Sequence, residues 1–152
     1  MTRAAPFNFA ANESFSVEAR VKLDTVGAND MSPLVVSMDS KQYVLAVNAA
    51  GQAYLYLSSP TGDINCAARG TANVADGQWH TLRGVRDVAD GTVKIFVDDR
   101  LDGLSADRTT DDFSTPQPLT LGAYFYGPRR FFCKGLIRDV VIKSLGELGS
   151  ER

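Results

Sequence analysis

The sequence predicts an all-β fold, an antiparallel two-sheet sandwich or jelly roll, and three observations support this prediction. Apolar and polar residues alternate in many short segments, as they do in strands that bury one face. Turns rich in Gly, Asp and Pro separate these segments, and no extended window keeps a helical period. Finally, only four of the 18 acidic residues are Glu, and Asp is a residue of turns and caps rather than of helices.

The first half of the chain predicts four strands. Residues 15–23 alternate most regularly, with five apolar side chains separated by polar ones. A short apolar run follows at 34–38. Residues 43–47 and 53–57 alternate again, and the turn residues 48–51 between them predict a hairpin.

The middle of the chain predicts three more strands, at residues 63–69, 78–88 and 92–97. Asp90-Gly91 joins the last two, and this dipeptide is a strong hairpin signal. Asp98-Asp99 predicts another turn directly afterwards.

The last third predicts a long surface loop at 103–118, rich in Gly, Ser, Thr and Asp, followed by a strand at 119–123. Residues 124–130 form a turn around Gly127-Pro128. The closing strand at 131–143 has apolar residues on both faces, so we expect it in the centre of a sheet. Residues 145–152 are a polar C-terminal tail, which leaves one domain over 1–144.

Composition limits the classes of function. The 152 residues fit one domain with a sizeable core. A formal charge of −2 lacks the basic excess of a nucleic-acid-binding protein, so we expect no nucleic-acid partner. No apolar stretch approaches the ~20 residues of a membrane span, and no secretory signal is visible. We therefore expect a domain excised from a longer chain, or one exported by another route.

Three blocks resemble laminin-G-like domains of the concanavalin A-like lectin/glucanase superfamily. The first is Phe15-Ser-Val-Glu-Ala-Arg-Val-Lys-Leu23, similar to the opening strand of that family. The middle signature is similar to Asp76-Gly-Gln-Trp-His-Thr-Leu82, Gly84-Val-Arg86 and Lys94-Ile-Phe-Val-Asp-Asp-Arg-Leu101. Gly135-Leu-Ile-Arg-Asp-Val-Val-Ile142 is similar to the closing strand.

The resemblance implies a jelly-roll sandwich with one concave sheet. Such domains are usually non-catalytic modules that bind glycans or proteins outside the cell, and they are appended to hydrolases, adhesins, sialidases and phage virion proteins. Some bind calcium. Here Arg138 stands where the closing strand of the family often has the first of two acids, which departs from the family pattern for a calcium site. The resemblance supplies no disulfide between Cys66 and Cys133, so we expect reduced thiols.

The acidic residues do not predict an enzyme. Glucanases of this fold place two or three carboxylates alternately along one strand, so that they project together. Here Glu18 is alone in its strand, Asp139 adjoins Arg138, and Asp98 and Asp99 are neighbours in a turn. We therefore expect no catalytic residues.

The single histidine and the two cysteines also lack the spacing of a zinc site. In the resembled motif His80 and Trp79 are structural, and Trp79 belongs to the core. Asp107, Asp111 and Asp112 in the long loop are either solvated or ligands of a calcium ion. No other cofactor is predicted.

Two groups of residues are candidates for ligand contact. Tyr54 and Tyr56 share one face of their strand, and either line the concave sheet or only bury their rings. Tyr124, Tyr126 and Arg129 surround the Gly127-Pro128 turn, where aromatic rings could stack on sugars and Arg could donate hydrogen bonds. We take the turn as the recognition patch, with the concave face as the alternative.

The prediction for function is a non-catalytic recognition or adhesion module that binds glycan at an extracellular or virion surface. One alternative is a structural or receptor-binding domain of a phage virion or surface assembly, in contact with a protein surface or with a larger parent protein. A polysaccharide-active enzyme is the second alternative, and the missing carboxylate set counts against it.

Overall fold

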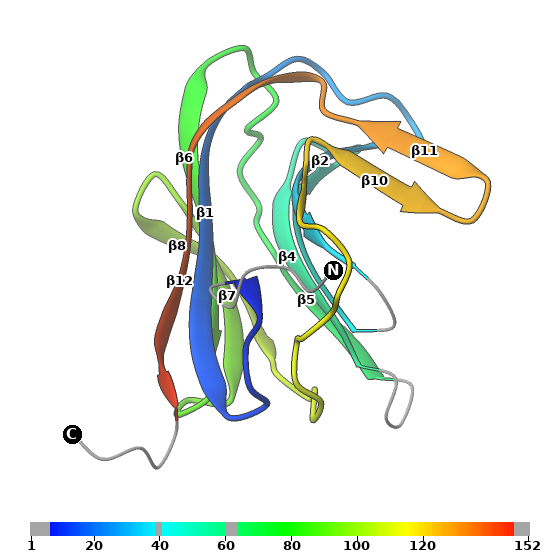
Figure 1. Cartoon of the computed structure of the whole chain (residues 1–152). Coiled ribbons are helices and arrows are strands. Elements are labelled where there is room, and N and C mark those ends of the chain that lie inside the picture. Colours follow the sequence, from blue (N-terminus) through cyan, green and yellow to red (C-terminus); the bar gives the residue numbers. More distant parts are fainter. Residues whose placement is uncertain (1–6, 39–40, 60–63, 148–152) are drawn as a thin grey trace.

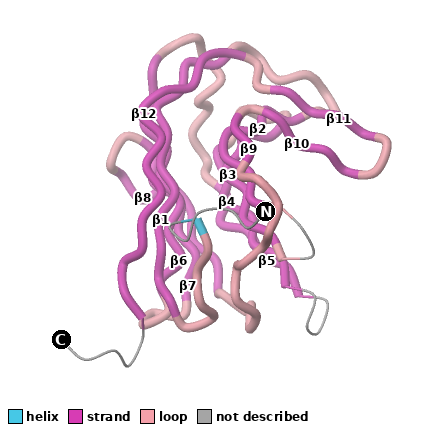
Figure 2. The backbone as a smooth tube through the Cα atoms, in the orientation of Figure 1, coloured by secondary structure: helices cyan, strands magenta, loops and turns pink. Residues whose placement is uncertain are grey.

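The computed structural model describes residues 7–38, 41–59 and 64–147. Two five-stranded antiparallel sheets pack face to face, and a two-stranded hairpin extends from one end of the sandwich (Figures 1 and 2). The first sheet has the order β12-β1-β6-β7-β8, the second has the order β5-β4-β3-β2-β9, and the hairpin is β10-β11. The predicted all-β antiparallel sandwich is confirmed.

The strands follow the alternating segments of the sequence closely. Their bounds are β1 Glu13–Leu23, β2 Met31–Ser37, β3 Gln42–Asn48, β4 Ala53–Ser59, β5 Ile64–Arg69, β6 Trp79–Asp87, β7 Thr92–Val97, β8 Arg100–Ala106, β9 Thr120–Leu121, β10 Ala123–Tyr126, β11 Arg129–Phe132 and β12 Gly135–Glu147. The predicted turns at 48–51, 90–91 and 98–99 each join consecutive strands. Gly51 and Gly91 adopt positive φ values of 79° and 67°, which glycine reaches at no steric cost.

The core lies between the two sheets. In β1, five alternating apolar side chains are fully buried, while the intervening Glu18, Arg20 and Lys22 point away from the core: Phe15, Val17, Ala19, Val21 and Leu23. In β4, Ala53, Leu55 and Leu57 are buried in the same way. Because side chains alternate along a strand, this burial turns Tyr54 and Tyr56 toward the outer face of the second sheet.

The closing strand is not central, which corrects one prediction. Among the described strands, β12 pairs only with β1, and it forms an edge of the first sheet. Its apolar residues occur on both faces because Ile137, Val140 and Ile142 pack against the core while Leu136 and Val141 are exposed. Residues 131 and 132 of the predicted strand, together with residues 129 and 130 of the predicted turn, form β11 of the hairpin instead. β12 also continues past residue 144, the predicted end of the domain, to Glu147.

Trp79 does not belong to the core, which corrects a second prediction. It pairs with the outward-facing Lys22, and this register places it on the outer face of the first sheet. The Arg138 and Arg20 guanidiniums lie 4.2 and 5.5 Å from the centre of its ring. The indole is only partly buried and serves as a platform for these two cations, not as a core side chain.

The segment predicted as a long surface loop at 103–118 is partly strand and partly core. Its first residues continue β8. Farther along, Phe113 is 1% exposed and contacts Phe15 edge to face at 5.6 Å between ring centroids. The polar composition of residues 103–118 predicted a surface loop, but Phe113, the one aromatic residue in this segment, packs into the core and holds the segment against the end of the sandwich.

Cys66 and Cys133 are free thiols in the structure, as expected. No helix in the described part of the chain is long and apolar enough to cross a membrane.

Candidate ligand pocket on the second sheet

A second apolar cluster lies on the outer face of the second sheet, separate from the core. Its buried members are Val36, Val44 and Ala46, which face outward from β2 and β3. The outward-facing tyrosines of β4 pack beside them, and the β10-β11 hairpin lies against β2 and adds Tyr124. The hairpin thus covers part of a sheet face that would otherwise be open (Figure 1).

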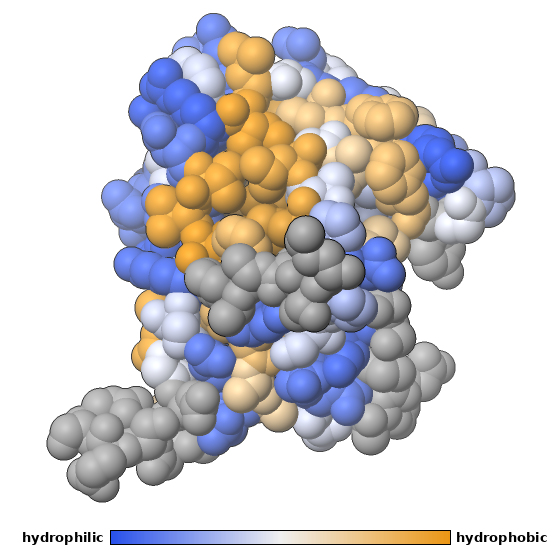
Figure 3. All heavy atoms as spheres, in the orientation of Figure 1, coloured by the Kyte–Doolittle hydropathy of each residue, from blue (hydrophilic) through white to orange (hydrophobic). Residues whose placement is uncertain are grey.

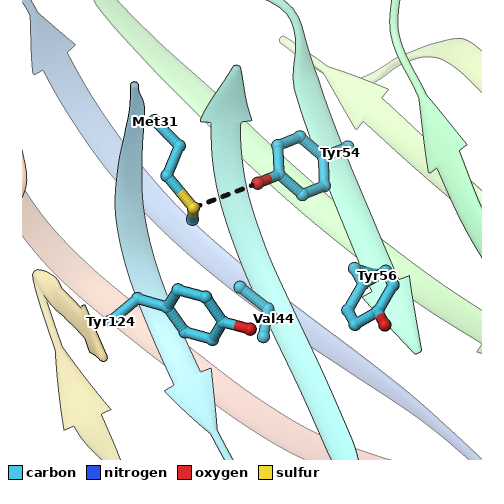
Figure 4. Close-up of a pocket in the computed structure, with 5 residues that line it drawn as sticks. All are labelled: Met31, Val44, Tyr54, Tyr56 and Tyr124. Atoms are coloured by element: carbon cyan, nitrogen blue, oxygen red, sulfur yellow. Dashed lines mark hydrogen bonds between the residues drawn. The ribbon is translucent and has the colours of Figure 1, made fainter. Parts of the chain in front are cut away.

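Part of this cluster lines a half-open pocket of about 170 Å³ (Figure 4). Its lining consists of Met31, Val44, Tyr54, Tyr56 and Tyr124. A cavity of about 150 Å³ is enough to hold benzene. The pocket therefore offers space for one six-membered ring, against a mostly aromatic lining.

The polar atoms of the pocket are phenolic hydroxyl groups. The Tyr54 hydroxyl donates a hydrogen bond to the Met31 sulfur at 3.6 Å (Figure 4), and the Tyr124 hydroxyl donates one to Gln42 Oε1 at 3.4 Å. Burial raises the pKa of Tyr54 to about 12. The Tyr54 hydroxyl is therefore neutral at physiological pH, and it offers a donor and an acceptor without charge.

The structure brings together three of the five residues predicted for ligand contact. Tyr54 and Tyr56 from the sheet and Tyr124 from the hairpin line the same pocket, although the sequence suggested the sheet face and the turn as alternative sites. Arg129 is not part of the lining; its guanidinium donates a hydrogen bond to the Asn29 carbonyl at 3.2 Å and lies over the Phe131 ring. The backbone of Tyr126 pairs with Arg129, but its side chain lies outside the described residues.

Sequence reasoning missed Val44 and Met31. Val44 had a signal, because it is apolar at an outward position of a strand whose alternate residues already fill the core. Apolar residues on both faces of a strand are one sign of a covered second face, and here Tyr124 of the hairpin packs on it. Met31 had no such signal, because only the fold brings it beside Tyr54.

The acidic residues considered for calcium each have another partner. Asp107 is buried and forms an ion pair with Arg86 at 2.8 Å. Asp112 pairs with Lys41, and Asp111 accepts a hydrogen bond from Ser59. Within the described ranges, no group of three or more His, Cys, Asp or Glu side chains is arranged to hold a metal ion.

His80 is held between two carboxylates, which supports the structural interpretation of this residue. Its Nδ1 lies 2.7 Å from Asp98 Oδ2 and its Nε2 lies 2.9 Å from Asp76 Oδ1. Burial disfavours the imidazolium, but the hydrogen bonds to Asp98 and Asp76 outweigh it and raise the pKa of His80. The histidine thus ties the segment before β6 to the turn between β7 and β8.

Comparison with known proteins gives one family match. A model of the concanavalin A-like lectin/glucanases superfamily matches residues 2–145. No curated protein sequence matches significantly.

Several solved structures share the fold. The CBM40 module of a Ruminococcus gnavus IT-sialidase, bound to α2,3-sialyllactose, superposes with a TM-score of 0.67 at 11% identity, over 95% of this chain and 88% of that one. Domains LG4-5 of the mouse laminin α1 chain give 0.63 at 15% identity, over 93% and 39%. The binding domain of botulinum neurotoxin serotype D gives 0.64 at 14% identity, over 97% and 36%. At these identities the likeness shows the fold alone.

Proposed function

The chain belongs to the concanavalin A-like lectin/glucanases superfamily, and we propose that it is a non-catalytic recognition module that binds glycan at an extracellular or particle surface. The pocket formed by Tyr54, Tyr56 and Tyr124 carries this proposal. A sugar ring has an apolar face that packs on an aromatic ring and a rim of hydroxyl groups that need hydrogen-bond partners. The pocket supplies rings and phenolic hydroxyls in a space suited to one ring.

The similar structures support the same interpretation. The CBM40 module was solved with sialyllactose, and a similar fold forms the binding domain of a neurotoxin. A fold adapted to recognition in these proteins makes recognition the first function to test here.

Protein contact is a second candidate, and a different surface favours it. Phe125 and Phe132 are 42% and 52% exposed, and their rings meet nearly perpendicularly at 6.2 Å on the hairpin. By strand alternation they face away from Tyr124 and Phe131. Exposed aromatic pairs of this kind are typical of protein interfaces, as in a receptor-binding or structural domain of a virion or surface assembly.

A glycan array followed by calorimetry tests the main proposal. We expect the Tyr124→Ala and Tyr56→Ala variants to bind the best array ligand at least tenfold more weakly, about 1.4 kcal/mol, which is the size of one lost ring contact. Phe125→Ala is the matched control, because it removes a ring from the opposite face of the same hairpin. Array measurements with calcium and with a chelator test whether binding depends on a metal ion.

The proposal fails if the unmodified domain binds no glycan on the array. It also fails if Phe125→Ala weakens binding while Tyr124→Ala does not. That second result would favour contact through the exposed aromatic pair.

A further inference from the structure

Among the outward positions of the described strands in the second sheet, one carries a charge, and it neighbours Tyr54 of the pocket. Arg69 on β5 lies directly opposite Tyr54 on β4 in the antiparallel register, so both side chains project from the same face. The other outward positions of the described strands in this sheet are apolar or neutral. They are Met31, Pro33, Val36, Gln42, Val44, Ala46, Asn48, Tyr54, Tyr56, Ser58, Asn65, Ala67 and Thr120.

The charge of Arg69 is not neutralised locally. The residue is exposed, and its guanidinium makes no hydrogen bond or ion pair with a described residue. Asp102 lies against the adjacent Gly70, but its carboxylate accepts hydrogen bonds from the Thr71 hydroxyl and from the backbone of Thr71 and Ala72. Arg69 is therefore a cation next to Tyr54 in the strand register that is available to a ligand.

The pocket itself is compatible with a negative ligand. None of its five lining residues carries a carboxylate, and the hydroxyl of Tyr54, the cross-strand partner of Arg69, is protonated at neutral pH. A neutral sugar in this pocket would gain ring packing and hydroxyl contacts only. A sugar with an acidic substituent would also gain a charge-assisted hydrogen bond, which is about twice as strong as a neutral one and is bidentate with a carboxylate or a sulfate.

We propose that the domain selects anionic sugars: the tyrosine pocket holds one ring, and Arg69 pairs with a carboxylate or sulfate on that ring. This inference rests on the proposed glycan-binding function and deepens it by naming the ligand class. It also assigns a specificity role to a residue that does not line the pocket.

Calorimetry with matched probes tests the inference. The probes are 3′-sialyllactose, a glucuronate-terminated disaccharide, 6-sulfated N-acetyllactosamine and neutral lactose. We expect at least one anionic probe to bind tenfold or more tightly than lactose, with an affinity that falls as salt is added. Comparison of the sialyl and glucuronyl probes with the sulfated probe identifies the acidic group.

Substitutions then assign the preference to one residue. Arg69→Gln should remove the preference for the anionic probe and leave lactose binding unchanged. Arg69→Lys should keep part of the preference, because it retains the charge without the planar fork. Lys143→Gln is the control, because it removes one positive charge from β12 of the opposite sheet. Its affinities should match those of the unmodified domain.

Two results overturn the inference alone. One is equal binding of lactose and all anionic probes with a retained dependence on Tyr124. The other is a preference for anions that survives Arg69→Gln. Absence of binding to every probe and to the array overturns the proposed function itself, and the inference with it.

Discussion

The spacing between the two sheets depends on Gly84, and an alanine at this position tests the packing directly. Gly84 lies in β6 opposite Val17 and Ile95, both fully buried, so it faces the core. A Cβ at Gly84 would lie 2.8, 2.9 and 3.0 Å from the Cβ, Cδ2 and Cγ atoms of Leu55 on the opposite sheet. Three contacts shorter than normal carbon–carbon packing mean that Leu55 or the sheets must shift.

The expected cost is that of an overpacked core, about 1 to 3 kcal/mol. For a domain of this size, about 2 kcal/mol lowers the Tm by roughly 4 to 8 °C. Urea unfolding of Gly84→Ala measures the free energy directly. Gly27→Ala is the control, because nothing lies within 4 Å of its added Cβ.

A double-mutant cycle identifies the cause. Leu55→Ala alone removes a fully buried side chain and should cost about 2 to 5 kcal/mol. In the double variant the new methyl group of residue 84 occupies space that Leu55 has left. The summed cost should therefore fall short of additivity by about 0.5 to 3 kcal/mol. Full additivity, or a Gly84→Ala variant as stable as the unmodified domain, would refute the contact between the sheets as described.

Two further predictions concern pH and the edge strand. The pKa of His80 is raised, so its contribution to folding stability is complete below the unfolded pKa of about 6.5 and disappears as pH rises through the folded pKa. The pKa values of Asp76 and Asp98 are lowered, so their contributions to folding stability require a pH above about 4. His80→Gln should therefore destabilise most near pH 5 to 6 and less near pH 9 in thermal unfolding, and a pH-independent loss would contradict this. In β12, Val140→Asp should lower the free energy of unfolding by about 1 to 3 kcal/mol, because Val140 packs against the core. Val141 is 43% exposed, so Val141→Asp should change it by no more than about 0.5 kcal/mol. Equal losses in urea unfolding would contradict the placement of both residues.

The local features of this fold were predictable because they depend on neighbouring residues. The alternation in β1 and β4 specifies which side chains enter the core, and the 48–51 and Asp90-Gly91 turns specify two hairpins. The prediction that β12 is central failed for a physical reason. Apolar residues on both faces occur in a buried central strand and equally in an edge strand whose outer face is exposed, and the sequence of one strand does not distinguish them.

Trp79 shows the same limit at a single residue. Its burial depends on register, and a shift of one residue exchanges the two faces of a strand. Its pairing with Lys22 turns it outward, beneath two arginines that each lie 59 positions from it in the chain. Neither Arg20 nor Arg138 predicts this contact by itself.

For the candidate site, the sequence determined the parts and the tertiary structure determined their combination. The period of two residues places Tyr54 and Tyr56 on one face, and composition marks the segment around Gly127-Pro128 as aromatic. Only the folded chain decides that the hairpin lies against β2. As a result Tyr124 lines the same pocket as Tyr54 and Tyr56, whereas Arg129 does not line it. Side-chain alternation is a local property, whereas the position of a hairpin depends on contacts between residues distant in sequence. Those contacts exist only in the folded chain.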